Sequence, residues 1–222
     1  MGLFSKKECA NCGGKAGIIM RQKIADGSYL CGKCLENCSE ELTPADYGRM
    51  TLDSYRQHIV ERSAAVEFHP TIILKNGLRE LVCADDERKL WKNASRQKPD
   101  VFRYDQVVGC QVKISTRKLR DDEKGSASPS ASPVARGLVG ALASVAGVSA
   151  AGVNAGGFPG MPQCRPDEKV TEMKVIVTVN HPVISEVVVQ VMPFSSNASS
   201  AAVNEASQAA YNIYRFFGDI RN

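Results

Sequence analysis

The chain has 222 residues, of which 43% are hydrophobic and 23% charged, and its formal net charge is +4. This length suits one medium-sized domain with a small satellite, and a mean hydropathy of −0.21 excludes a polytopic membrane protein but not one local membrane contact. The charge is too mild to indicate a concentrated nucleic-acid-binding face.

Cysteine usage indicates a metal site rather than a disulfide framework. Five of the eight cysteines crowd into residues 9–38, and the opening residues lack the apolar core of a secretion signal. We therefore expect a reducing, cytoplasmic setting. Cys83 and Cys110 stand in apolar, strand-like runs and are expected to be buried free thiols.

Two CxxC pairs dominate the N-terminal region, Cys9 with Cys12 and Cys31 with Cys34. Eighteen residues separate the pairs, which is a spacing typical of one zinc ion held by four thiolates. Four protein ligands leave no open coordination position, so we expect a structural zinc rather than a catalytic one. A redox role for the second pair is the alternative, although a redox CxxC normally stands alone on a larger α/β domain.

The residues between the two pairs predict a hairpin. Asp26 and Gly27 form the strongest short turn signal in the chain, and strand-like residues flank them. The expected order is a knuckle at the first pair, a hairpin, and a helix that starts at the second pair and runs toward Cys38, which is a treble-clef-like arrangement. Cys38 is either a substitute ligand or a plain helix thiol.

Four N-terminal segments are similar to a bacterial domain of unknown function, family number 4428. They are MetGlyLeuPheSerLysLysGluCys, CysAlaAsnCysGlyGly, AspGlySerTyrLeuCysGlyLysCysLeu and SerGluGluLeuThrPro. The resemblance covers about the first fifth of the chain. It implies that Cys9, Cys12, Cys31 and Cys34 are metal ligands, and it brings no activity with it.

A bridging helical region follows the zinc module. Thr43 is suited to cap a helix whose first residue is Pro44. A second helical stretch over residues 51–62 places Leu52, Tyr55, Ile59 and Val60 near one face. His58 lies beside this stripe, either as a fifth candidate ligand or as a half-exposed helix histidine.

Short strands are predicted next. The strand-like runs are 71–74, 81–84, 88–92 and 107–114. Asp85 to Glu87 are expected to form a solvated hairpin turn, because no histidine nearby completes a metal site. Trp91, the only tryptophan, is expected in the core.

An insert rich in glycine, alanine and serine interrupts the strands, and residues 137–164 carry no charge. Small residues recur at spacing four from Ala143 to Ala155, which would let helix backbones approach closely. Three interpretations stay open for this segment: a flexible or self-packed loop, a helix pair used in oligomerisation, and a membrane contact. Glycine, alanine and serine add little transfer energy, so stable spanning is marginal.

Two strands over 170–180 and 186–191 and a final helix are predicted after the insert. The helix stripe is Val203, Ala206, Ala210, Ile213 and Phe217, and Gly218 is expected to end it. The strand order, the insert and the last helix are similar to bacterial pleckstrin-homology-like domains over residues 66–218. That looser resemblance implies no lipid-binding residue.

The predicted fold class is α+β: a small treble-clef-like zinc module followed by an antiparallel PH-like sheet with a C-terminal helix. The expected divisions are the zinc module 1–42, the bridging helix 43–65, the first strands 66–122, the insert 123–168, and the last strands and helix 169–222.

No catalytic signature was found: the chain has no GxSxG, GxGxxG or P-loop, and His69 and His181 are expected in turns. We expect a non-catalytic adaptor or assembly protein that acts through protein contacts and self-association, with no small-molecule substrate. One alternative is a membrane-associated oligomer that uses residues 137–164. Another is nucleic-acid binding through the zinc module, which has little support: six cations oppose five anions over residues 1–42, and four thiolates around zinc add two negative charges.

Overall fold

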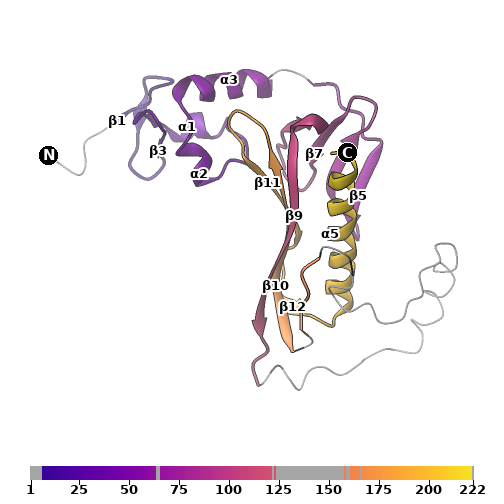
Figure 1. The fold of residues 1–222 in the computed structure, drawn as a ribbon. Coiled ribbons are helices and arrows are strands. Elements are labelled where there is room, and N and C mark those ends of the chain that lie inside the picture. Colours follow the sequence, from indigo (N-terminus) through magenta and orange to yellow (C-terminus); the bar gives the residue numbers. More distant parts are fainter. Residues whose placement is uncertain are drawn as a thin grey trace. The chain divides into compact units, whose positions relative to one another are not determined.

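The structure is a computed structural model, and it describes residues 7–63, 66–121, 123, 158, 161–165 and 167–221. It is a mixed fold with antiparallel sheets and a long C-terminal helix, as the sequence predicts (Figure 1). The chain divides into two compact units. The first comprises residues 1–111, 175–190 and 212–222, and the second comprises residues 112–174 and 191–211.

The N-terminal part of the first unit contains two short hairpins and three helices. They are β1 (Lys7–Glu8), β2 (Lys15–Ala16), β3 (Gln22–Lys23), β4 (Tyr29–Leu30), α1 (Gly32–Leu35), α2 (Pro44–Tyr47) and α3 (Leu52–Ser63). Strand β1 pairs antiparallel with β2, and β3 pairs antiparallel with β4 around the predicted turn. Gly27 adopts a φ of 84° in that turn, a conformation that glycine reaches without strain. The helix after the second cysteine pair is short, and it ends before Cys38.

The predicted helix cap is confirmed. The Thr43 side chain accepts a hydrogen bond from the backbone of Asp46, the Asp46 side chain accepts one in return from the Thr43 backbone, and Pro44 is the first helical residue. This reciprocal cap satisfies backbone donors that the first turn leaves open.

Helix α3 packs Leu52, Tyr55 and Ile59 of its predicted apolar face against the hydrophobic core. Tyr55 and His58 are its buried residues, whereas Val60 is 68% exposed. The prediction of a half-exposed His58 was wrong, because its ring is only 2% exposed and accepts a hydrogen bond from the backbone of Ser39. The segment that contains Ser39 packs against His58 and buries it, which helical spacing alone did not reveal.

The first sheet is an antiparallel run of four strands in the order β5-β6-β7-β8. The strands are β5 (Ile72–Asn76), β6 (Arg79–Asp85), β7 (Leu90–Asn93) and β8 (Val101–Arg103). The first three match predicted runs. The fourth strand was missed, because three residues are too few to show an alternation of apolar and polar side chains.

The acidic turn between β6 and β7 is only partly solvated. Asp86 and Glu87 are exposed as predicted, but Asp85 ends β6 and is fully buried, which corrects the prediction for that residue. Its carboxylate accepts hydrogen bonds from the backbone amides of His69 and Arg88. The buried carboxylate therefore stabilises this turn by hydrogen bonds to backbone amides.

The second sheet has the order β11-β10-β12, and β9 also pairs with β10. Its strands are β9 (Val107–Lys118), β10 (Glu168–Val179), β11 (Glu186–Met192) and β12 (Ser196–Asn197). Strands β9, β10 and β11 were predicted. The two-residue β12 was missed, since a polar pair carries no strand signal. A short 3₁₀ turn over Tyr104–Gln106 precedes β9.

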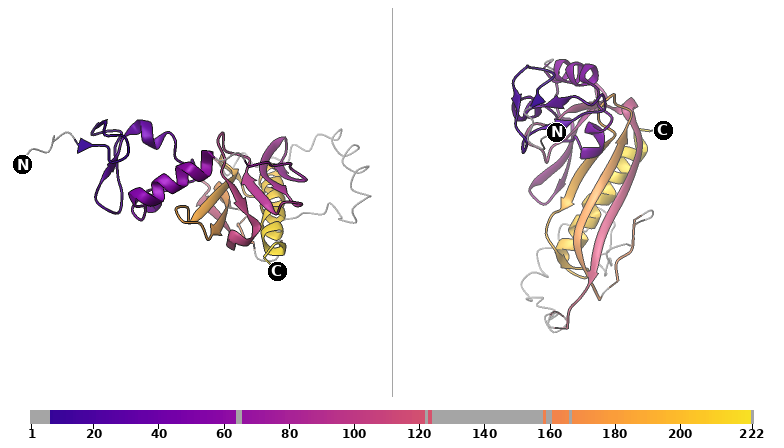
Figure 2. Two further views of the ribbon diagram at one scale, coloured as in Figure 1. Left: turned by 90° about the horizontal axis from the view of Figure 1, so that it is seen from above. Right: turned by 90° about the vertical axis from the view of Figure 1, so that its left-hand side faces the viewer.

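Helix α5 (Ala201–Asp219) runs alongside the long strands β9 and β10 (Figure 2). Every member of its predicted stripe is fully buried, as expected. In the first unit, Trp91 is also fully buried and lies between Phe102 and Phe217. In the second unit, Phe158 stacks on Tyr211 of the helix with ring centroids 4.6 Å apart.

Most of the uncharged segment 137–164, and with it the three interpretations of that segment, lies outside the described residues. None of the helices in the described part of the chain combines the length and apolar character needed to cross a bilayer. Of the two predicted buried thiols, Cys83 is buried, whereas Cys110 is only half-buried.

Candidate metal centre

The four predicted ligand cysteines come together. The Sγ atoms of Cys9, Cys12, Cys31 and Cys34 all lie within 4.8 Å of one another, and none of these cysteines forms a disulfide. The Cys9 and Cys34 sulfurs are 3.7 Å apart, as are the Cys12 and Cys31 sulfurs. In a tetrahedron with zinc–sulfur bonds of about 2.3 Å, neighbouring sulfurs lie about 3.8 Å apart. The donor set and its spacing therefore fit one tetrahedral zinc ion.

A tight knuckle presents the first pair. The Cys9 amide donates to the Gly14 carbonyl at 2.7 Å, and the Gly13 amide donates to the Cys9 carbonyl at 2.8 Å. Gly13 has a φ of 70°, which a residue with a side chain adopts only with strain. This glycine lets the chain reverse directly after Cys12.

The second pair sits where α1 begins. Cys31 is the residue that precedes the helix, and Cys34 is its third residue. The Cys34 amide donates to the Cys31 carbonyl at 3.0 Å, which brings both side chains to the same end of the helix. The spacing of the CxxC pair is thus a consequence of one helical turn.

Backbone amides favour the thiolate of Cys9. Burial opposes its ionisation, but hydrogen bonds from the backbone of Cys12, Cys31 and Asn11 outweigh it and lower the pKa of Cys9 to about 6. Burial raises the pKa of Cys34 to about 12, against a hydrogen bond donated by the Asn11 side chain. Zinc would supply the positive charge that allows all four sulfurs to ionise together.

Neither alternative ligand belongs to the cluster. Cys38 is buried with its sulfur 3.8 Å from the Cys34 carbonyl, and burial raises its pKa. The Nε2 atom of His58 accepts a hydrogen bond from the Ser39 backbone at 3.3 Å. Cys38 packs in the same hydrophobic cluster as the four cysteines, and the four-cysteine group includes neither Cys38 nor His58.

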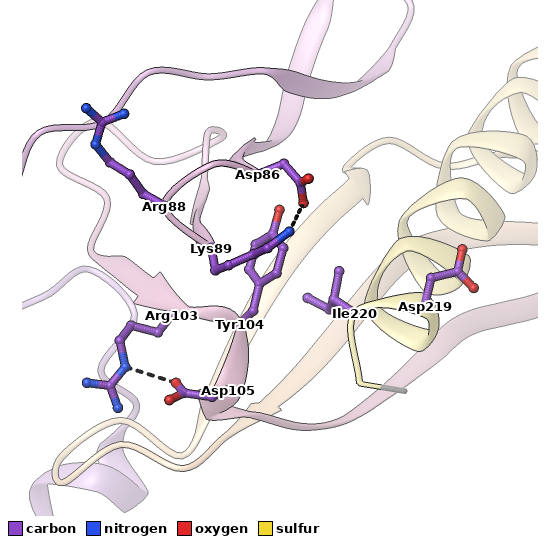
Figure 3. Close-up of a pocket in the computed structure, with 8 residues that line it drawn as sticks. All are labelled: Asp86, Arg88, Lys89, Arg103, Tyr104, Asp105, Asp219 and Ile220. Carbon is purple, nitrogen blue, oxygen red and sulfur yellow. Dashed lines mark hydrogen bonds and ion pairs between the residues drawn. The ribbon is translucent and has the colours of Figure 1, made fainter.

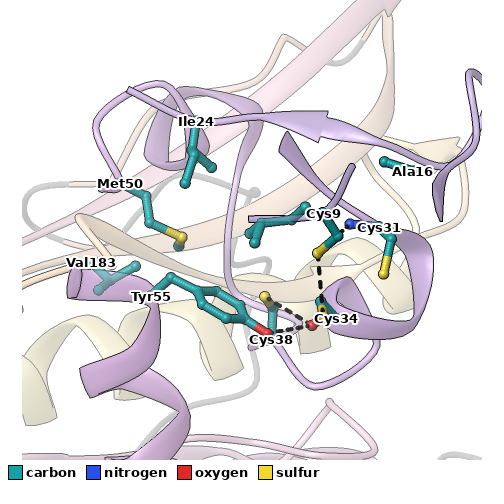
Figure 4. Packing of buried hydrophobic residues seen from close by; sticks show 10 residues of the cluster. Cys9, Ala16, Ile24, Cys31, Cys34, Cys38, Met50, Tyr55 and Val183 are labelled. Carbon is teal, nitrogen blue, oxygen red and sulfur yellow. Dashed lines mark hydrogen bonds between the residues drawn. The ribbon is translucent and has the colours of Figure 1, made fainter. Parts of the chain in front are cut away.

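The cysteines are part of a hydrophobic core rather than an appendage to it. Cys9, Cys31 and Cys34 pack with Met50 and Tyr55, which precede and belong to α3 (Figure 4). The Tyr55 hydroxyl donates to the Cys34 carbonyl at 3.1 Å. The helix therefore supports the backbone that carries the fourth sulfur.

Buried polar contacts join the N-terminal module to strands of the same unit. The Asn93 amide donates to Glu41 at 3.0 Å and to the Val188 carbonyl at 3.1 Å. The Ser185 hydroxyl donates to Asp46 at 2.7 Å, and Asp46 also accepts from Arg49. Asn93 and Ser185 are far in the chain from the partners that they contact here, and no sequence signal pointed to these contacts.

A third polar group surrounds His58. Asp100 accepts hydrogen bonds from Ser39 and Arg62, and the rings of His58 and His181 lie 6.0 Å apart, edge to face. Asp100, Arg62 and the two histidines help to line a cavity of about 230 Å³. His181 was predicted in a turn, and it does lie in the connection between β10 and β11.

Acidification is expected to destabilise the fold through His58. Burial lowers the pKa of His58 to about 4, and a protonated ring could no longer accept from Ser39. The folded state then binds fewer protons than the unfolded chain. The contribution of His58 to the free energy of unfolding is therefore complete above a pH of about 6.5 and is lost as the pH falls toward 4. The expected loss is up to about 3 kcal/mol.

Glu41 opposes this trend, because burial raises its pKa to about 6. The informative comparison is thermal unfolding of the native chain and of His58→Gln between pH values of about 7 and 5. The glutamine keeps an acceptor for the Ser39 amide and does not titrate, so its midpoint should fall less on acidification. Equal pH slopes in the two proteins would exclude the assigned role of His58.

A separate cavity of about 680 Å³ lies beside the 3₁₀ turn, where the C-terminal end of α5 contributes Asp219 and Ile220 (Figure 3). Its charges largely pair with one another: Lys89 bonds to Asp86, and Arg103 bonds to a neighbouring carboxylate. Burial raises the pKa of Tyr104 to about 12, so this lining hydroxyl stays protonated at neutral pH. The lining therefore does not present an obvious reactive group.

Comparison with known proteins agrees with the N-terminal geometry. Residues 7–58 match the model of a family described as Domain of unknown function (DUF4428), which confirms the resemblance inferred from the cysteine-bearing segments. The match extends through most of α3, the helix that packs against the cysteines. No curated protein and no solved structure matches the chain. The resemblance of the remaining residues to PH-like domains stays a prediction.

Proposed function

We propose that the chain is a non-catalytic adaptor or assembly protein whose N-terminal module holds one structural zinc ion. The observation that carries the proposal is the set of four sulfurs within 4.8 Å of one another, two pairs of which are 3.7 Å apart. Four protein ligands fill the coordination shell of zinc, and a filled shell leaves no position for water or substrate. The metal then contributes to folding and not to catalysis.

The buried polar contacts support a fixed orientation of the N-terminal module on the strands of the same unit. Asn93 and Glu41 are almost completely buried, as is Asp46, and each has at least one hydrogen-bond partner, although Oε2 of Glu41 has none among the described residues. Satisfied polar groups in a core favour one arrangement over its alternatives, because any other packing would leave them without partners. A module held in this way offers partners a surface of fixed orientation.

Self-association is the second element of the proposal, and residues 137–164 are the segment to which we assign it. The experiment is light scattering after size exclusion on the full chain and on a chain in which a glycine- and serine-rich linker of equal length replaces residues 126–165. The native chain is expected to assemble and the replaced chain to be monomeric, with its zinc content unchanged. The same mass for both proteins would refute the role of this segment.

A further inference from the structure

The connection between β2 and β3 exposes three consecutive apolar side chains. Ile18 is 51% exposed, Ile19 93% and Met20 63%, whereas Ala16 before them and Ile24 after them are buried. Single exposed apolar residues are ordinary, but an adjacent group of three indicates a contact surface. The loop therefore has an exposed apolar tip, and the chain has a buried residue on either side of it.

Positive charge surrounds this tip. Lys15, Arg21 and Lys23 flank it, and the sequence has no acidic residue between Glu8 and Asp26. The Arg21 guanidinium lies 4.9 Å from the centre of the Tyr29 ring. The ammonium of Lys7 lies 5.8 Å from the same ring, which adds a further cation to this side of the module.

The root of the loop is held by the segment that carries the metal ligands. A Cβ atom placed on Gly32 would lie 3.2 Å from the Cβ of Met20, so the loop packs closely over the start of α1. Gly32 directly follows the ligand Cys31. The apolar tip therefore lies directly against the residue that follows a ligand cysteine.

We infer that the loop of residues 17–21 is a membrane-contact site that inserts Ile18 and Ile19 into the interface of an anionic lipid bilayer. Lys15, Arg21 and Lys23 would lie at the level of the phosphate and carboxylate headgroups. An apolar tip with cations at its base combines the two contributions that hold proteins at such interfaces, burial of apolar area and attraction to anionic lipid. The cations favour a lipid surface over an apolar protein groove, because only the former supplies a field of negative charge.

The electrostatic part should be moderate. Each cation near an anionic surface strengthens binding roughly fivefold at low salt, but a zinc ion with four thiolates carries two negative charges in the same module. We therefore expect insertion of the isoleucines to dominate. This inference does not depend on the proposed adaptor role, and it concerns a different segment from residues 137–164.

The test is flotation of the full, zinc-loaded chain with vesicles of phosphatidylcholine, with and without phosphatidylserine. The native chain is expected to float with the phosphatidylserine vesicles and to be retained less at high salt. The double variant Ile18→Ser/Ile19→Ser should bind about tenfold more weakly or worse. Leu78→Ser is the matched control, since Leu78 is a fully exposed apolar residue in a β-hairpin turn of the same unit, and it should bind as the native chain does.

Four outcomes would overturn the inference: no flotation of the native chain, no loss in the double variant, equal loss in Leu78→Ser, or loss only when residues 126–165 are replaced. A fifth would reassign the loop. If the native chain does not float but its mass in solution falls on Ile18→Ser/Ile19→Ser, the occupant of the loop is a second copy of the chain. Circular dichroism of each variant checks that the fold is intact.

Discussion

Replacing Cys34 by serine is expected to abolish zinc binding and to unfold residues 7–58. In the proposed zinc centre the Cys34 thiolate closes the coordination shell, and Cys34 also lies in the core beside Tyr55. Structural zinc sites with cysteine ligands contribute on the order of 10 kcal/mol to folding, and such small modules are unfolded without metal. The measurements are zinc content after purification under reducing conditions and hydrogen exchange of the N-terminal amides, which should lose their protection.

Cys38→Ser is the matched control for this experiment. Cys38 is buried in the same core and is 3.8 Å from the Cys34 carbonyl, but it is not part of the four-sulfur group. Its loss should leave zinc content and protection of the module in place. If Cys38→Ser also removed the zinc, or if Cys34→Ser retained it, the assignment of the ligands would be wrong.

Truncating the single tryptophan should have the second largest effect. The Trp91 side chain is fully buried, its ring stacks on Phe102 with centroids 5.0 Å apart, and it meets Phe217 edge to face at 4.6 Å. Trp91→Ala removes these contacts and leaves a cavity, which costs about 3 to 5 kcal/mol. Equilibrium unfolding in urea, followed by circular dichroism, measures the loss.

Trp91→Phe separates the aromatic contacts from the indole nitrogen. Among the described residues the buried Nε1 atom has no hydrogen-bond partner, so its removal should cost no hydrogen bond. The phenylalanine variant should therefore lose much less stability than the alanine variant. Equal losses would mean that the aromatic stack does not stabilise this core.

Local chemistry made several parts of the fold predictable. A CxxC pair brings two sulfurs together across one turn, and Thr43 with Pro44 defines a helix start whatever surrounds it. The stripe of α5 repeats over about four turns, so its buried face could be predicted from spacing alone. In each case the signal lies within a few neighbouring residues.

Contacts between distant segments were not predictable in the same way. His58 was expected to be half-exposed because the residues that cover it, including Ser39 and His181, come from other parts of the chain. Asn93 and Glu41 meet across 52 positions of the chain, and no pattern in the sequence pairs them. Burial of such polar residues depends on the tertiary fold, which periodicity does not encode.

The most direct test is the metal content of the intact chain, measured by elemental analysis of protein purified under reducing conditions without added metal. A tetrahedral centre built from Cys9, Cys12, Cys31 and Cys34 predicts one zinc ion per chain, released only when the thiols are modified or strongly chelated. Protein that is folded and free of stoichiometric metal would contradict the centre, and the adaptor proposal that rests on it would fail as well.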